Sequence, residues 1–146
     1  MLSPTGKLKG DLTLLNWGDG TFWIMGSYYL RAWHMRWFND QIQDGVSVRD
    51  LGDDICGFAL IGPNSHFILQ KVAEGDVSKM RFMDCKRLDI GLIQSHVARI
   101  SVTGEMGFEL NCKMGDHIAL RRRLLEAGAD PDLREVGVNA RLSRRV

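Results

Sequence analysis

The sequence predicts an α+β fold built from mostly antiparallel sheets with helices packed against them. Segments with alternating apolar residues are joined by short glycine-containing turns, a pattern typical of β-hairpins. Between these segments lie others whose apolar residues recur at helical spacing. The 146 residues are 45% apolar and 25% charged, as in ordinary globular proteins. We therefore expect residues 1–146 to form a single domain.

The first predicted element is a β-hairpin with strands over residues 7–16 and 21–27. Leucines alternate with polar residues along the first strand, which suits a half-buried strand. The connecting residues 16–20 read Asn-Trp-Gly-Asp-Gly, and their glycines tolerate the positive φ that a tight hairpin turn needs.

A helix is expected after this hairpin, over residues 28–44. Ser27 suits the N-cap position, and Gly45 suits the position just beyond the C-terminus. The apolar stripe of this helix contains Leu30, Trp33, Trp37 and Ile42.

Strands are expected over residues 46–51 and 54–62, and Gly62-Pro63 then ends the second of them. A short helix over residues 64–73 should follow, because proline is well placed in a first helical turn. Residues 80–90 and 92–102 read as two further strands.

The last part of the chain predicts a hairpin, a helix and a tail. The stretch ARISVTGEMGFEL, residues 98–110, closes a hairpin through its glycine-containing turn. Residues 115–130 form a helix that Gly128 ends, and Asp116 near its start favours the helix dipole. Residues 132–146 also have helical spacing.

Charge and cysteine content narrow the functional classes. The net charge of +1 provides no field for attracting nucleic acid or a membrane surface, and no apolar run is long enough to span a bilayer. The cysteines, Cys56, Cys85 and Cys112, are odd in number and lack metal-ligand spacing. We expect reduced thiols, no metal site and a cytoplasmic protein.

Five stretches, in order and in spacing, resemble the folate-binding domain of the aminomethyltransferase family. That family includes the glycine-cleavage aminomethyltransferase (T-protein) and the C-terminal domains of dimethylglycine and sarcosine dehydrogenases, which this chain resembles most. Compared with these proteins, the chain looks like an internal fragment of the domain. The stretches are residues 1–15, 26–38, 58–72, 98–110 and 133–146.

The resemblance implies that Glu109 binds the pterin ring of tetrahydrofolate. A pterin edge presents a ring N–H beside an exocyclic amine, and a carboxylate can accept a hydrogen bond from each. Because Phe108 and Leu110 flank it in a strand, Glu109 faces away from both. The alternative is a strand residue that merely faces solvent.

Two more site residues follow from the same resemblance. Asp11 matches the family's aspartate near the reactive nitrogens of tetrahydrofolate, and its implied role is catalytic, as a fixed negative charge or a proton relay. Many relatives have two adjacent acids there, whereas this chain has Gly10-Asp11. Arg145 matches an arginine that lines the folate cavity. The alternatives are a surface aspartate and a solvated chain end.

The implied function is one-carbon (aminomethyl or methylene) transfer to tetrahydrofolate within a dimethylglycine or sarcosine dehydrogenase-like protein. The implied partners are folate, a small methylated amine and a flavin dehydrogenase domain or subunit. FAD would bind in that other domain, since this chain has no Gly-x-Gly-x-x-Gly motif. A eukaryotic parent would place it in the mitochondrial matrix. The alternatives are a non-catalytic folate-binding or regulatory module and an inactive fragment, and we expect the isolated chain to be inactive.

Overall fold

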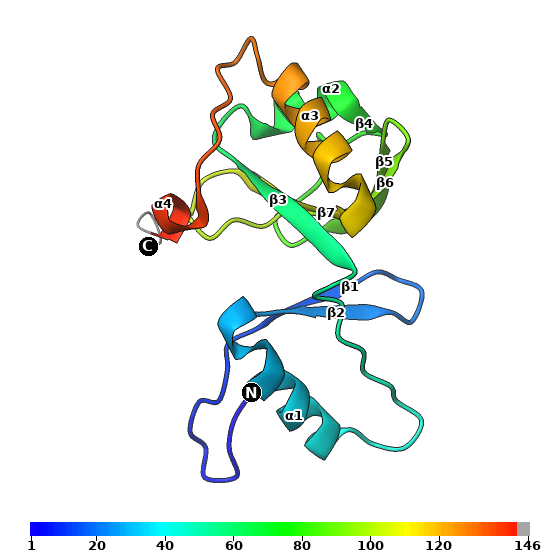
Figure 1. Ribbon diagram of the computed structural model, residues 1–146, viewed down its shortest axis with the longest axis vertical. Coiled ribbons are helices and arrows are strands. Elements are labelled where there is room, and N and C mark those ends of the chain that lie inside the picture. Colours follow the sequence, from blue (N-terminus) through cyan, green and yellow to red (C-terminus); the bar gives the residue numbers. More distant parts are fainter. Residues whose placement is uncertain (143–146) are drawn as a thin grey trace. The chain divides into compact units, whose positions relative to one another are not determined.

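The computed structural model describes the backbone of residues 1–142 and the side chains of residues 1–140. The chain divides into two compact units, Met1–Asp53 and Asp54–Val146, which are described separately below (Figure 1). Strands pair antiparallel in both units and helices accompany them, so the predicted α+β class is confirmed. The expectation of a single domain stays a prediction.

The first unit contains a two-stranded hairpin and one α-helix. Strand β1 spans Thr13–Asn16 and pairs antiparallel with β2, Phe22–Met25. A short 3-10 helix over Tyr28–Leu30 leads into α1, Arg31–Gln41. The hairpin and the helix are therefore confirmed, but both hairpin strands are shorter than predicted, and the helix ends at Gln41 and not just before Gly45.

The first strand begins late because residues 1–10 make a turn of their own. The amino group of Met1 donates to the carbonyl of Gly10 at 2.9 Å, and the amide of Lys9 donates to the Met1 carbonyl at 2.9 Å. An isolated bridge also joins Leu2 to Leu8. These bonds occupy the backbone groups that a longer β1 would have offered to β2.

Residues 46–51, predicted as a strand, have no regular structure. Side chains hold this segment instead. The guanidinium of Arg31 donates from Nε to Asp50 at 2.5 Å and from its two terminal nitrogens to Asp53 at 3.0 and 2.7 Å. A Cβ built on Gly52 would lie 2.7 Å from the Arg31 guanidinium carbon, so the loop passes very close to this arginine.

We expect acid to destabilise the first unit through this cluster. Hydrogen bonds from Gly52 and Arg31 lower the pKa of Asp50 below 3.8, and Arg31 lowers that of Asp53. Both carboxylates therefore stabilise the fold at pH values above their unfolded-state pKa. This stability is lost as the pH falls through the lower folded-state pKa. Denaturant titrations of Asp50→Asn between about pH 6 and about pH 3 should show a weaker acid dependence than the parent. Asp44→Asn should retain the dependence of the parent, and equal curves for all three proteins would contradict the expectation.

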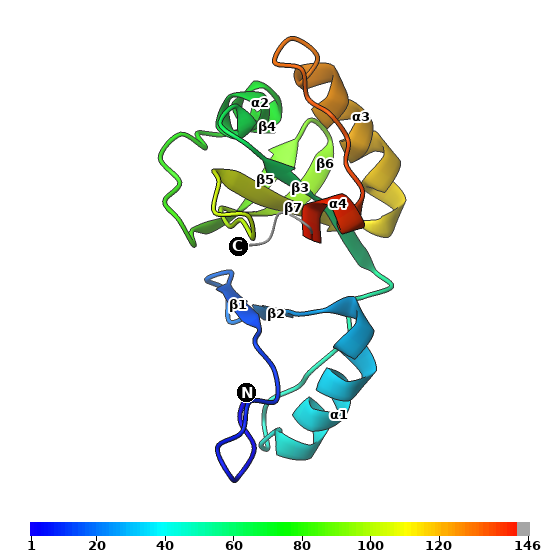
Figure 2. The same ribbon diagram turned by 90° about the vertical axis from the view of Figure 1, so that its left-hand side faces the viewer.

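The second unit is built on a five-stranded antiparallel sheet with strand order β3-β7-β6-β5-β4. Helices α2 and α3 lie beside this sheet (Figures 1 and 2). The strands are β3, Ile55–Ile61; β4, Ala73–Glu74; β5, Cys85–Ile90; β6, Ile93–Ala98; and β7, Gly107–Lys113. The α-helices are α2, Ser65–Val72; α3, His117–Ala127; and α4, Val138–Leu142, and a 3-10 helix spans Met114–Asp116.

Most predicted elements of this unit are confirmed, with differences at the ends of two strands and one additional strand. The strand expected over residues 80–90 begins only at Cys85, because Met83 has a φ of 71° and interrupts extended backbone. The strand expected to run to residue 102 ends at Ala98, so a long loop joins β6 to β7. The short strand β4 was not predicted.

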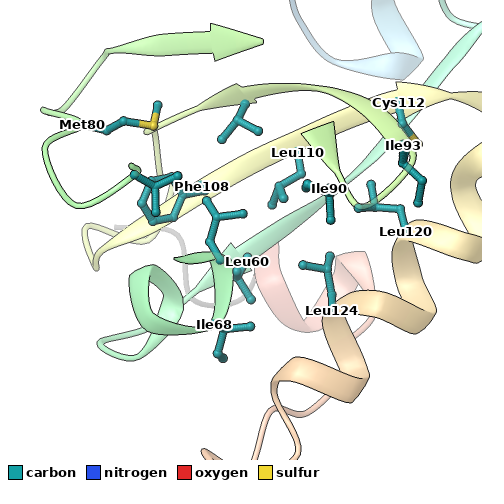
Figure 3. Close-up of a cluster of buried hydrophobic side chains, with 13 residues drawn as sticks. Leu60, Ile68, Met80, Ile90, Ile93, Phe108, Leu110, Cys112, Leu120 and Leu124 are labelled. Carbon is teal, nitrogen blue, oxygen red and sulfur yellow. The ribbon is translucent and has the colours of Figure 1, made fainter. Parts of the chain in front are cut away.

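The hydrophobic core lies between one face of the sheet and the helices α2 and α3 (Figure 3). Side chains alternate between the two faces of a strand, so every second residue of β7 enters this core. Phe108 and Leu110 from β7 are no more than 1% exposed, as is Leu120 from α3. Glu109 and Asn111 therefore point to the opposite face of the sheet.

Candidate functional site

Glu109 occupies the middle of β7, which lies between β3 and β6. Its direct neighbours across the two ladders are Ala59 in β3 and Ala98 in β6. The glutamate is half-buried, whereas Phe108 and Leu110 on either side of it are buried in the core. The sequence prediction that Glu109 lies in a strand and faces away from its apolar neighbours is confirmed.

The sheet surface around Glu109 is lined by small side chains. Ala59 and Ala98 carry only methyl groups beside the carboxylate, and of the two Ala59 is exposed whereas Ala98 is fully buried. Gly57 and Gly107 carry no side chain at all. We call this surface the Glu109 face, defined by Gly57, Ala59, Ala98, Gly107, Glu109 and Asn111. Because Gly57 and Ala59 are exposed and have little or no side chain, a flat ring can approach the sheet closely on the β3 side of Glu109.

Asn111 adds a second polar group to the Glu109 face. It lies two residues along β7 from Glu109 and pairs with Gly57 and His96. Its Oδ1 leans over Gly57, where an added Cβ would lie only 2.6 Å away. Its Nδ2 is buried and has no hydrogen-bond partner in the described part of the chain. A buried donor of this kind is costly unless a ligand accepts from it.

Sequence reasoning missed Asn111. The available signal was the alternation Glu-Leu-Asn, which places a second polar residue on the strand face that Glu109 uses. A lone asparagine in a strand is usually a surface residue, so the pattern alone gave it no role.

Asp11 lies in the first unit, in the irregular segment that precedes β1, and its side chain is exposed. Glu109 belongs to the second unit, so the implied role of both carboxylates at one bound tetrahydrofolate stays a prediction. Arg145 lies outside the described residues, and its proposed place in the folate cavity likewise stays a prediction.

Cys112 belongs to the hydrophobic core and Cys56 packs against it, and both carry free thiols. Cys112 is 1% exposed and stands directly opposite Cys56 across β3 and β7. Burial raises the pKa of the Cys112 thiol to about 12, with a smaller contribution from Cys56 beside it. A thiol with so high a pKa is a poor nucleophile near neutral pH.

Among the described residues, no group of three or more His, Cys, Asp or Glu side chains is arranged to hold a metal ion. No helix in the same part of the chain is both long and apolar enough to cross a membrane.

Comparisons with known proteins agree with the fold and the strand pattern. The family model described as the GCVT N-terminal domain matches residues 1–146. The aminomethyltransferase of Bacillus licheniformis is 39% identical over 106 residues, covering 72% of this chain and 29% of that protein. The mitochondrial dimethylglycine dehydrogenase of Rattus norvegicus is 30% identical over 145 residues, covering 96% of this chain and 17% of that protein.

A solved structure shows the same fold. The heterotetrameric sarcosine oxidase of Corynebacterium sp. U-96 aligns with a TM-score of 0.68 over 90% of this chain and 66% of that one, at 18% identity. The chain spans less than a third of the two relatives named above. Because the family model matches the whole of its length, the chain belongs to the GCVT N-terminal domain family.

Proposed function

We propose that the chain is a tetrahydrofolate-binding part of a one-carbon transfer domain, in which the Glu109 face receives the pterin ring. The observation that carries this proposal is the position of Glu109, half-buried in a central strand between Ala59 of β3 and Ala98 of β6. A glutamate that only faced solvent would be expected at an exposed position and not half-buried in a central strand. Its small neighbours also leave room for a planar ligand.

The chemistry of the face suits a pterin. The Glu109 carboxylate accepts from the ring N–H and the exocyclic amine, while the exposed methyl group of Ala59 contacts the ring beside it. The pterin carbonyl next to that N–H is an acceptor, and it matches the unpartnered Nδ2 donor of Asn111. The donor and acceptor pattern of the ring edge is thus complementary to one strand of this sheet.

Tetrahydrofolate, when bound, supplies the nitrogen nucleophiles that accept the one-carbon group. Asp11 is the residue that we assign to the reacting nitrogens, where its carboxylate stabilises developing positive charge and holds a proton. Arg145 is assigned to a carboxylate of the folate glutamate tail.

The larger protein proposed for this domain is a dimethylglycine or sarcosine dehydrogenase-like enzyme. Support comes from the rat dimethylglycine dehydrogenase, which aligns with nearly the whole chain, and from the sarcosine oxidase fold. In such a protein a flavin domain or subunit would oxidise a small methylated amine, and FAD would bind there. The chain described here would receive the one-carbon product on folate.

Titration of the 15N-labelled chain with 5-formyltetrahydrofolate tests the assignment of Glu109. The chain supplies only part of a cavity wall, so we expect weak binding that NMR still detects. Glu109→Gln should weaken it about tenfold or more, because the amide replaces one acceptor with a donor that faces a pterin donor. Glu126→Gln, an exposed glutamate on α3, is the matched control and should leave the affinity unchanged. Equal affinities for the parent and Glu109→Gln would exclude the proposed pterin site.

A further inference from the structure

Strand β3 forms one edge of the five-stranded sheet, and β7 is its one neighbour in the described part of the chain. The other edge is formed by β4, which has two residues, whereas β3 has seven. An edge strand presents amides and carbonyls that its single neighbour does not satisfy. The unsatisfied backbone groups at the edges of this sheet are therefore concentrated along β3.

The register of β3 with β7 fixes which backbone groups point away from β7. Just before β3, the amide of Met114 donates to the carbonyl of Asp54 at 2.9 Å. Just after β3, the amide of Gly62 donates to the carbonyl of Met106 at 2.8 Å. Both bonds join residues that are directly opposite when this register is continued, and hydrogen-bonded pairs alternate with non-hydrogen-bonded pairs along an antiparallel ladder. We call the residues whose amides and carbonyls point away from β7 the outward residues, and they are Ile55, Gly57, Ala59 and Ile61.

The outward residues have no backbone hydrogen-bond partner among the described residues. Gly57 and Ala59 are exposed, so solvent reaches the edge. Natural edge strands are commonly protected by a charged residue, a proline or a bulge. The sequence of β3, Ile-Cys-Gly-Phe-Ala-Leu-Ile, has no charge and no proline, and its register with β7 is unbroken. Nothing within β3 thus opposes the addition of another strand.

We propose that β3 pairs antiparallel with β3 of a second copy of this chain, so that the two sheets join into one. A two-fold axis midway between the two Phe58 residues places Ile55 of one copy opposite Ile61 of the other. The same axis places Gly57 opposite Ala59. Each of these pairs joins two outward residues, and such a pair exchanges two hydrogen bonds. Every outward amide and carbonyl of both copies thereby gains a partner.

This symmetric register fits a second copy better than an unrelated strand. The outward groups recur at every second residue, so a shift of one residue would bring the wrong groups together, and a shift of two would leave some unpaired. A two-fold axis supplies the matching alternation automatically. The carboxylate of Asp54 lies beyond the end of β3 and falls near Gly62 of the other copy, so the axis brings no like charges together.

This inference goes beyond the proposed function and does not rest on it. Hydrogen bonds between neighbouring strands lie in the plane of the sheet, whereas a ring reaches the Glu109 face from above that plane. Gly57 and Ala59 therefore offer their backbone groups to a second copy without using the surface assigned to the pterin.

Sedimentation velocity and hydrogen exchange test the pairing on the 146-residue chain itself. From about 1 μM to about 1 mM, we expect a monomer that converts reversibly into a dimer. At the higher concentration the amides of the outward residues should exchange about tenfold more slowly or less. The amides of Cys56, Phe58 and Leu60, which face β7, should be protected at both concentrations.

A proline substitution tests the outward amides directly. Ile61→Pro removes one of them without removing a hydrogen bond to β7, and an edge strand tolerates proline where the lost amide faced solvent. We expect this variant to dimerise about tenfold more weakly or worse, because the symmetric contact loses a hydrogen bond from each copy. Ile61→Val is the matched control, since it also shortens the side chain but keeps the amide, and it should dimerise like the parent.

Three results would overturn the proposal. The chain could stay monomeric at about 1 mM. It could dimerise while the outward amides exchange equally fast at both concentrations, which would place the contact elsewhere. Ile61→Pro could fold and dimerise like the parent. The exchange measurement needs no variant, so it decides the matter even if Ile61→Pro fails to fold. Dimerisation in Glu109→Gln with unchanged folate affinity would contradict the pterin site and leave this inference standing.

Discussion

Replacing Phe108 by alanine is expected to lower the free energy of unfolding of the second unit by about 3–5 kcal/mol. The ring is 1% exposed and stands opposite Leu60 across β3 and β7, within the core shown in Figure 3. Its removal loses the burial of a large apolar side chain and leaves a cavity that a central strand cannot close by moving. Typical domains are stable by only about 5–15 kcal/mol, so this loss should be evident in urea titrations followed by circular dichroism.

Phe67→Ala is the matched control for this substitution. Phe67 lies on α2 with 60% of its surface exposed, so truncation removes little buried area. We expect a change within about 1 kcal/mol of the parent. A similar loss in both variants, or a negligible one in Phe108→Ala, would contradict the position of the core between the sheet and the helices.

Replacing Gly57 by alanine is expected to destabilise the same unit by about 1–3 kcal/mol, toward the upper end of that range. A Cβ built on Gly57 would lie 2.2 Å from the carbonyl oxygen of Leu110 and 2.6 Å from Oδ1 of Asn111. The asparagine side chain can rotate away, but the carbonyl belongs to the backbone of β7. Relief of this contact therefore requires β3 and β7 to separate locally, with loss of ladder hydrogen bonds.

Gly115→Ala separates this clash from the general effect of adding a methyl group. Gly115 lies in the 3-10 helix before α3, and a Cβ there would meet no atom within 4 Å. We expect this variant to unfold at nearly the same urea concentration as the parent, because the added methyl group has open space. Unchanged stability in Gly57→Ala would show that β3 and β7 are not as close as the structure places them.

The elements with strong local signals were predicted well. Helix α2 follows a Gly-Pro pair, α3 ends at Gly128 as predicted, and the hairpin of β1 and β2 has glycines with φ near 80° in its turn. Each of these signals lies within a few residues of the element whose start or end it marks. It can therefore be recognised without knowing the fold.

Elements that depend on distant contacts were predicted poorly. Residues 46–51 have the alternation of a strand, but Arg31 binds Asp50 within this segment and Asp53 just after it, and no strand pairs with the segment. Met83 adopts a positive φ inside a segment that reads as a strand. The competing interactions come from residues far away in the sequence, which a local pattern does not contain.

In the candidate site, too, the features that depend on local sequence were predicted and those that depend on distant contacts were not. The alternation around Glu109 predicted its orientation, because side-chain direction in a strand depends only on the order of residues. The alanines beside it come from β3 and β6, so the shape of the Glu109 face required the strand register. Likewise, the outward residues of β3 are identified only through its register with β7.

The most direct test of the central claim is to locate the pterin ring on the sheet. Nuclear Overhauser effects between the pteridine protons of bound 5-formyltetrahydrofolate and the methyl groups of the labelled chain report this position. If the Glu109 face receives the ring, contacts to the exposed methyl group of Ala59 should appear and should disappear in Glu109→Gln. Contacts confined to methyl groups elsewhere, such as that of the exposed Ile118 on α3, would contradict the proposed site.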